Sequence, residues 1–197
     1  LAILTLIDKF NGLKEILKVH NDDYRKAILT YLAIWIDRLA ARLTTFGLID
    51  VGRETIVDLF GRQTIPMIFD FPELSIFSTE QISWILKVIE SESFEFESVC
   101  INASSGEKTQ FPKKYLTTVI TDPPYYDAIA YADLSDFFYT WLKRTLSDVY
   151  PLNFSTPQTP KSEECTALKH HHNESFEKAK KHFEYKLLQI FTSIEYQ

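Results

Sequence analysis

Residues 117–127 read Thr-Thr-Val-Ile-Thr-Asp-Pro-Pro-Tyr-Tyr-Asp. The run from Thr117 to Thr121 is rich in β-branched residues, a composition typical of a buried strand. Pro123 and Pro124 end that strand, because proline cannot donate to a β-ladder. A carboxylate and two tyrosines then stand at the carboxyl end of the strand, where open α/β sheets bind their ligands. The stretch therefore predicts an α/β sheet with a binding site at the end of this strand.

The tetrapeptide Asp122-Pro123-Pro124-Tyr125 resembles the D/N-P-P-Y/F motif of amino-methyltransferases that use S-adenosylmethionine. The resemblance implies that the Asp122 carboxylate and the Pro123 carbonyl accept both hydrogens of an NH2 group, so that catalysis is mostly orientation. It also implies that Pro124 fixes the turn and that Tyr125 stacks on a flipped base. On these four residues alone, a strand that ends in a Pro-Pro turn beside a packing tyrosine remains the alternative.

The residues after the motif make the resemblance more specific. From Tyr126 to Leu142 the chain reads YDAIAYADLSDFFYTWL, which is similar to the block after D-P-P-Y in large prokaryotic proteins described as adenine-specific DNA methylases. Two flanking stretches, 60–71 and 156–164, resemble an upstream and a downstream block of that family. The family implies part of a class I methyltransferase (Rossmann-like) sheet in residues 94–197. Residues 1–93 would form a helical and loop-rich annex.

The resemblance implies transfer of a methyl group from S-adenosylmethionine to the exocyclic amino group of adenine in DNA. Tyr126, Asp127 and Tyr131 would then line the base pocket, and Lys161 would touch a phosphate. A simpler interpretation of the same residues is a helix cap at Asp127 between two packing tyrosines. Two alternatives to the DNA enzyme also stay open. One is the same transfer to an amine of RNA or protein, and the other is a non-catalytic scaffold or binding module that keeps the fold.

Half of the cofactor site is expected to lie outside this chain. The resemblance places Asn102 and Ala103 at the end of a strand over 95–103, where an acidic residue usually contacts the adenine of S-adenosylmethionine, and places Asp122 beside the same cofactor. Asn102 departs from that pattern because an amide brings no charge, and it is also a plausible strand-end turn residue. None of the five glycines lies close enough to another to form the Gly-rich cofactor loop. We therefore expect an internal fragment, inactive alone, whose parent chain supplies that loop.

The composition agrees with a cytoplasmic globular protein. Hydrophobic residues make up 45% and charged residues 24% of the 197 residues, and the net charge is −6, which argues against an extended basic surface while allowing a local basic cleft. Cys100 and Cys165 predict no disulfide framework, and no apolar run reaches the length of a membrane span. The run 170–172 is three histidines, which on a helix point about 100° apart, so we predict no metal site there.

Apolar spacing predicts helices over 1–20, from a cap at Asn21 or Asp22 to near Gly47, after Ser78, over 132–146, and after a cap at Asn173. Residues 46–78 and 150–162 are expected to be loops. On the second helix we expect Arg38 and Arg42 to be solvated charges beside Asp37, with contact to a phosphate as the alternative, and on the last helix we expect Lys186 to face water. The expected buried face of the second helix is Tyr24, Ile28, Tyr31, Leu32, Trp35, Leu39 and Leu43.

Overall fold

The computed structural model describes residues 2–57, 59–61, 64, 66–69, 75, 80–91, 104–108 and 111–196. The chain divides into two compact units, neither of which is continuous in sequence. The first unit comprises Leu1–Phe94 and Asp133–Thr159, and the second comprises Glu95–Ala132 and Pro160–Gln197.

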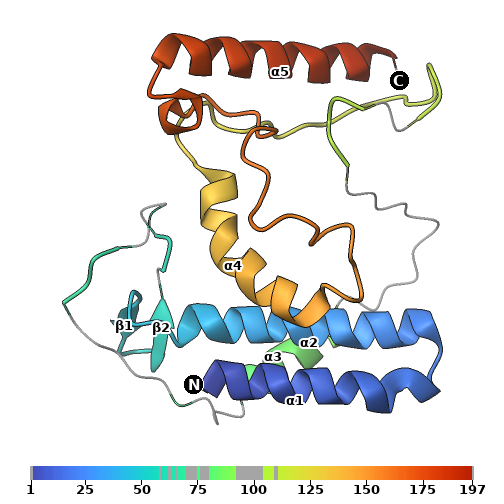
Figure 1. Ribbon diagram of the computed structural model, residues 1–197, viewed down its shortest axis with the longest axis vertical. Coiled ribbons are helices and arrows are strands. Elements are labelled where there is room, and N and C mark those ends of the chain that lie inside the picture. Colours follow the sequence, from blue (N-terminus) through green and yellow to red (C-terminus); the bar gives the residue numbers. More distant parts are fainter. Residues whose placement is uncertain are drawn as a thin grey trace. The chain divides into compact units, whose positions relative to one another are not determined.

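The first unit is built on two long helices, α1 (Ala2–Ile16) and α2 (Asp22–Arg42), joined by the short 3₁₀ turn η1 (Leu17–Val19). They lie side by side (Figure 1), and their facing residues form most of the core of this unit, to which residues 146 and 149 are added. The predicted cap is confirmed, because the Asn21 side chain accepts hydrogen bonds from the Asp23 and Tyr24 amides at 2.9 and 3.4 Å. The core residues are Ile7, Phe10, Leu17, Leu29, Ala33, Ile36, Leu146 and Val149.

The expected buried face of α2 is confirmed in part: Leu39 is buried, and Ile28, Leu32 and Trp35 are half-buried and pack against the core. The face that packs inward has its residues three to four positions apart and includes two alanines, which let the neighbouring backbone approach closely. Tyr24 and Tyr31 are exposed instead, so the prediction that they belong to the core is wrong. The buried apolar residues of α2 are Leu29, Ala33, Ile36, Leu39 and Ala40.

The charged residues of α2 are less solvated than expected. Asp37 is buried, the Arg38 guanidinium lies 4.1 Å from the ring centre of Trp84, and Arg42 donates a hydrogen bond to the Thr55 hydroxyl. The prediction that Arg38 and Arg42 are solvated is therefore wrong, since both side chains are half-buried. Asp37 lies one position from the core residue Ile36, so the packing that buries the apolar face also covers its carboxyl group.

The segment expected to be loop-rich contains an antiparallel hairpin of β1 (Leu48–Asp50) and β2 (Thr55–Val57). The strands pair Ile49 with Ile56, and the turn is held by the Arg53 amide, which donates to the Asp50 carbonyl and carboxylate. Glycines at the ends of such short strands hid the strand pattern. Among the described residues, this two-stranded hairpin is the one sheet that forms. It is too small to test the predicted α/β sheet, which stays a prediction.

The first unit also contains α3 (Glu80–Ser91) and all but the first two residues of α4 (Tyr131–Leu146). Both helices were predicted, and α4 starts one residue before the expected position. The ring of Phe60 meets the rings of Phe137 and Phe138 on α4 edge to face. The loop over 150–162 is also confirmed, and the Tyr139 hydroxyl and Lys143 ammonium groups of α4 donate to the Thr156 carbonyl at 2.7 and 2.5 Å.

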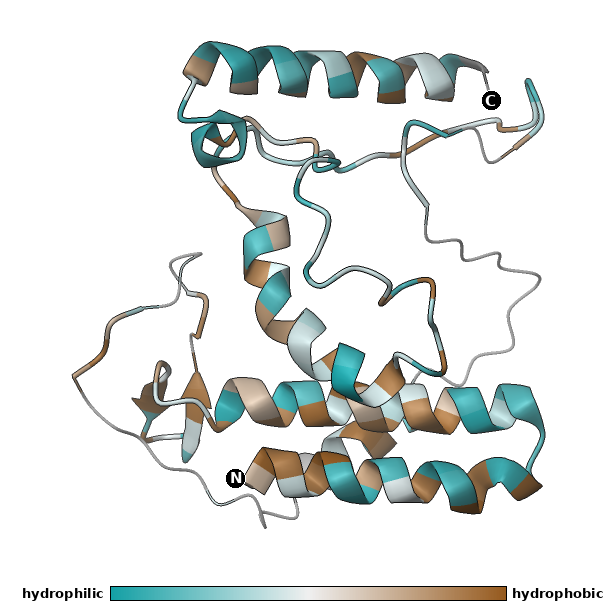
Figure 2. Ribbon diagram, in the orientation of Figure 1, coloured by the Kyte–Doolittle hydropathy of each residue, from teal (hydrophilic) through white to brown (hydrophobic). Residues whose placement is uncertain are grey.

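The second unit contains α5 (Phe176–Tyr196) and the 3₁₀ turn η2 (Lys169–His172). Hydrophilic residues predominate over the first half of α5, whereas α1 is hydrophobic over much of its length (Figure 2). The predicted cap at Asn173 is wrong, because Asn173 ends η2 in the left-handed conformation, at φ 54°. The Ser175 hydroxyl instead accepts a hydrogen bond from the Lys178 amide in the first turn of α5.

The predicted strand over 117–121 does not form in the structure. This run is exposed and belongs to no strand, and Ile120 is 93% exposed. A strand requires a partner for its backbone groups, and the expected neighbour over 95–103 lies outside the described residues.

Among the described helices, none has both the length and the hydropathy needed to cross a lipid bilayer.

Candidate functional site

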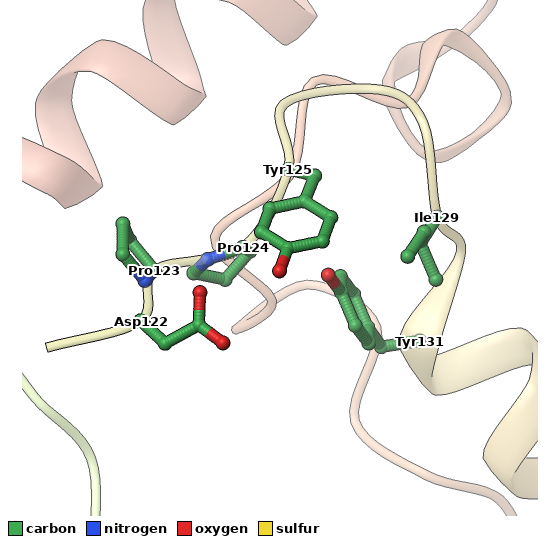
Figure 3. A pocket seen from close by; sticks show the side chains of 6 residues that line it. All are labelled: Asp122, Pro123, Pro124, Tyr125, Ile129 and Tyr131. Atoms are coloured by element: carbon green, nitrogen blue, oxygen red, sulfur yellow. The ribbon is translucent and has the colours of Figure 1, made fainter.

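A hollow of about 280 Å³ opens in the second unit around the Asp-Pro-Pro-Tyr stretch. Its volume lies near the lower end of the range of small-molecule pockets, which suits one planar group rather than a large ligand. Figure 3 shows that its walls come from one loop and the first residue of α4. The lining residues are Asp122, Pro123, Pro124, Tyr125, Ile129 and Tyr131.

The backbone explains why this loop turns back on itself. Proline fixes φ and lacks an amide hydrogen, so Pro123 and Pro124 leave the chain extended and poor in local donors. The Tyr126 amide then donates to the Pro124 carbonyl at 3.0 Å, and the Ala128 amide donates to the Tyr125 carbonyl at 2.9 Å. Within the described part of the chain, the Pro123 carbonyl accepts no backbone hydrogen bond. It is therefore free to accept one from a ligand.

Tyr126 makes the turn possible by adopting a positive φ of 52°. Its ring meets the edge of Phe183 on α5, with ring centres 5.0 Å apart. A left-handed conformation is uncommon for a tyrosine and requires support from its surroundings. The contact with Phe183 supplies this support, which makes Tyr126 a structural anchor of the loop in this structure.

The polar groups of the hollow face one another. Figure 3 shows the carboxylate of Asp122 pointing toward the hydroxyl group of Tyr125, with the hydroxyl group of Tyr131 beyond it. The negative charge of Asp122, and next the hydrogen bond to its carboxylate, raise the pKa of the Tyr125 hydroxyl above its usual value. The single proton of the Tyr125 hydroxyl is thus directed at Asp122, while more than half of the Tyr125 surface is exposed at the hollow.

The structure brings together all four predicted catalytic residues and one predicted substrate contact, Tyr131. Tyr126 packs on Phe183, Asp127 is exposed, and neither lines the hollow. Lys161 is half-buried in the same unit and does not line it. The predicted cofactor contacts over 102–103 lie outside the described residues.

Ile129 is the lining residue that the sequence analysis missed. It stands two positions before Tyr131, the first residue of α4, in a stretch that belongs to no helix or strand. Without the periodicity of an element, the sequence carries no signal that would have identified it. Ile129 adds an apolar wall opposite the polar groups, an arrangement usual for sites that bind planar ligands with one polar edge.

The residues present suit both a planar amine and a cationic methyl donor. A carboxylate and a free carbonyl are acceptors for an NH2 group, and a carboxylate beside tyrosine faces is also favourable for a positive charge such as a sulfonium. Of the predicted cofactor contacts, Asp122 is the one within the described residues.

Comparisons with known proteins give no match to any family model, curated protein or solved structure.

Proposed function

We propose that this chain is part of an S-adenosylmethionine-dependent methyltransferase that modifies the exocyclic amino group of adenine in DNA. The observation that supports this function best is that Asp122, Pro123 and Tyr125 line one small hollow, and that the Pro123 carbonyl accepts no backbone hydrogen bond from the described residues. A primary amine on a planar base needs two acceptors and a stacking face, and this loop offers all three.

Each residue of the loop has a separate role in binding the target base. Asp122 and the Pro123 carbonyl accept the two amine hydrogens, which fixes the direction of the nitrogen lone pair. Tyr125 stacks on the base, and Ile129 and Tyr131 close the pocket around it. Pro124 keeps the backbone from relaxing, because its φ is fixed.

When bound, S-adenosylmethionine supplies the electrophilic methyl group, and the chain's own part is orientation and exclusion of other poses. The amine is a weak nucleophile, and it becomes acidic once it has been alkylated. Its proton therefore leaves after the new N–C bond has formed. A general base of high pKa is not required, which agrees with an exposed carboxylate such as Asp122 at this position.

The test measures methyl transfer to adenine-containing DNA by the full-length protein and its Asp122→Ala variant. Loss of one orienting acceptor should lower the rate by at least about 100-fold, the size expected when the reacting group is misplaced. Glu177→Ala is the matched control, because Glu177 is exposed on α5 and forms an exposed ion pair with Lys181. An Asp122→Ala rate close to that of the unchanged protein would contradict the proposal.

Substrate and cofactor require separate measurements. Parallel assays with RNA and with protein acceptors distinguish the DNA enzyme from the other amino-methyltransferases that share this motif. Calorimetric titration of the 197-residue chain with S-adenosylmethionine tests the expectation that part of the cofactor site lies elsewhere. Micromolar binding by this chain alone would contradict that expectation.

A further inference from the structure

The segment Glu164–Ala167 is hydrogen-bonded to both ends of the loop that walls the hollow. The Glu164 Oε1 atom accepts from the Ala132 amide at 3.0 Å, and the Ala167 amide donates to the Tyr126 carbonyl at 2.9 Å. Ala132 directly follows Tyr131, and Tyr126 directly follows Tyr125. The two bonds therefore fix the chain next to each of the two tyrosines that line the pocket.

Glu164 is held firmly in its place. Its side chain is only 9% exposed, and its backbone carbonyl lies 2.9 Å from Nε2 of His182 on α5. The second carboxylate oxygen, Oε2, is buried, accepts no hydrogen bond from the described residues, and lies 3.8 Å from Nδ1 of His171. Glu164 is thus tied to α5 through its backbone carbonyl and to the loop through its buried carboxylate, so it links the position of α5 to that of the loop.

The sequence explains why the contact has to come from a distant residue. The first amides of a helix lack partners within the helix and are usually capped by a Ser, Thr, Asp or Asn just before it. The residue before α4 is Ala130, which has no side-chain acceptor. Glu164, 32 positions later in the chain, satisfies the Ala132 amide instead. A local cap would have satisfied the amide without linking the loop to the rest of the unit.

We propose that Glu164 is a positioning residue for the candidate pocket: through the Ala132 amide it sets the place of Tyr131 relative to Tyr125, and so the width available to the target base. The inference rests on the proposed function for the identity of the base. The structural part, a link from Glu164 to the loop over 122–132, stands on the hydrogen bonds alone.

The structural part is tested by hydrogen exchange of the 197-residue chain, read by mass spectrometry on peptides that cover 122–132. Glu164→Ala should speed exchange in these peptides by at least about tenfold, the loss expected for one charge-assisted hydrogen bond. Glu164→Gln should restore protection, because its amide oxygen can still accept from the Ala132 amide. Glu177→Ala is the control. Unchanged exchange in Glu164→Ala would overturn the inference, as would exchange that rises equally over the whole chain.

The functional part is tested by methyl transfer with the full-length protein. Glu164→Ala should raise the KM for DNA by about tenfold or more with a smaller effect on kcat, and Glu164→Gln should regain most of the loss. A loss confined to kcat, or no rescue by glutamine, would overturn the positioning role. If the unchanged protein transfers no methyl group to any acceptor, the proposed function fails, and the exchange measurement still decides whether Glu164 holds the loop.

Discussion

The ammonium nitrogen of Lys186 lies 2.6 Å from a carboxylate oxygen of Glu107, and the Lys186 side chain is only 10% exposed. The same nitrogen lies 3.0 Å from Glu163, whose side chain is 71% exposed. Lys186 therefore joins α5 to two segments that are distant in sequence. The sequence prediction that Lys186 faces water is wrong, since helical spacing assigns a lysine to the polar face and does not show which loops cover that face.

Replacement of Lys186 by methionine should destabilise the second unit. It leaves Glu107 without its partner in a largely buried place, whereas Glu163 can return to water. We expect a loss on the order of 2 kcal/mol, below the usual effect of breaking a fully buried pair. Urea unfolding followed by circular dichroism measures it, with Lys181→Met as the control because Lys181 and Glu177 are both exposed. Equal losses for the two variants would contradict the prediction.

The same cluster predicts losses of stability at both extremes of pH. The hydrogen bond to Glu107 raises the pKa of Lys186, so its contribution is present below the usual value of 10.5 and is lost as the pH rises through the raised pKa. The hydrogen bond from Lys186 lowers the pKa of Glu163, so that contribution is present above 4.5 and is lost as the pH falls through the lowered pKa. In Lys186→Met, unfolding profiles should be flatter at both ends, and an unchanged profile would count against the cluster.

Asp37 should make the first unit less stable as the pH rises toward neutrality. Burial raises the pKa of its carboxyl group from 3.8 to about 7, and the residue is 8% exposed. The folded chain therefore binds a proton that the unfolded chain has released, and stability falls between about pH 4 and pH 7 by on the order of 3 kcal/mol. Above about pH 8 the carboxyl group is ionised in both states and the penalty is constant.

The variant Asp37→Asn isolates this effect, because asparagine has the shape of the protonated acid and cannot ionise. Thermal unfolding at pH 3 and at pH 8 should show a gain in stability at pH 8 and little change at pH 3, where the carboxyl group is protonated in both the folded and the unfolded chain. Asp8→Asn is the matched control, since Asp8 is exposed on α1. A gain of equal size at both pH values would mean that the charge of Asp37 is not the cause.

The helices were predictable because their signals are local. Asn21 was identified as a possible cap from its place before a run of apolar residues at helical spacing, and the helix over 131–146 from its wide aromatic face. The hairpin was not predictable, because strands of three residues are too short to show alternation. The burial of Asp37 was missed for a different reason, since sequence shows a charge and not its covering neighbours.

The candidate site was predicted in part. The resemblance of Asp-Pro-Pro-Tyr to the motif of amino-methyltransferases identified Asp122 and Tyr125, whereas the strand expected to present them does not form. The contact between Glu164 and Ala132 had no local signal, as the two residues are 32 positions apart. Only the absence of a capping side chain at Ala130 indicated that a distant acceptor was needed.

Two glycines predict opposite effects of the same change. A Cβ atom at Gly47 would overlap the Ile56 side chain of β2, so Gly47→Ala should destabilise the hairpin by about 1–3 kcal/mol. A Cβ atom at Gly12 meets nothing within 4 Å, and Gly12 lies inside α1, so Gly12→Ala should stabilise by about 0.5–1 kcal/mol. Thermal unfolding of both variants measures the difference, and the same sign for both would refute the packing argument at Gly47.

The geometry of the hollow predicts that the pKa of the Tyr125 hydroxyl depends on the charge of Asp122. The charge of Asp122 opposes formation of the tyrosinate, so Asp122→Asn should lower the pKa of Tyr125 back toward its ordinary value of 10.0. Carbon-13 NMR of chain labelled at the tyrosine ζ carbon follows the titration, and Tyr125→Phe assigns the signal. Asp127→Asn removes a nearby charge that does not line the hollow and should leave the signal in place.

If Asp122→Asn has no effect, or if Asp127→Asn has the same effect, the carboxylate of Asp122 does not face Tyr125 in solution. The two acceptors proposed for the target amine would then not converge on one point.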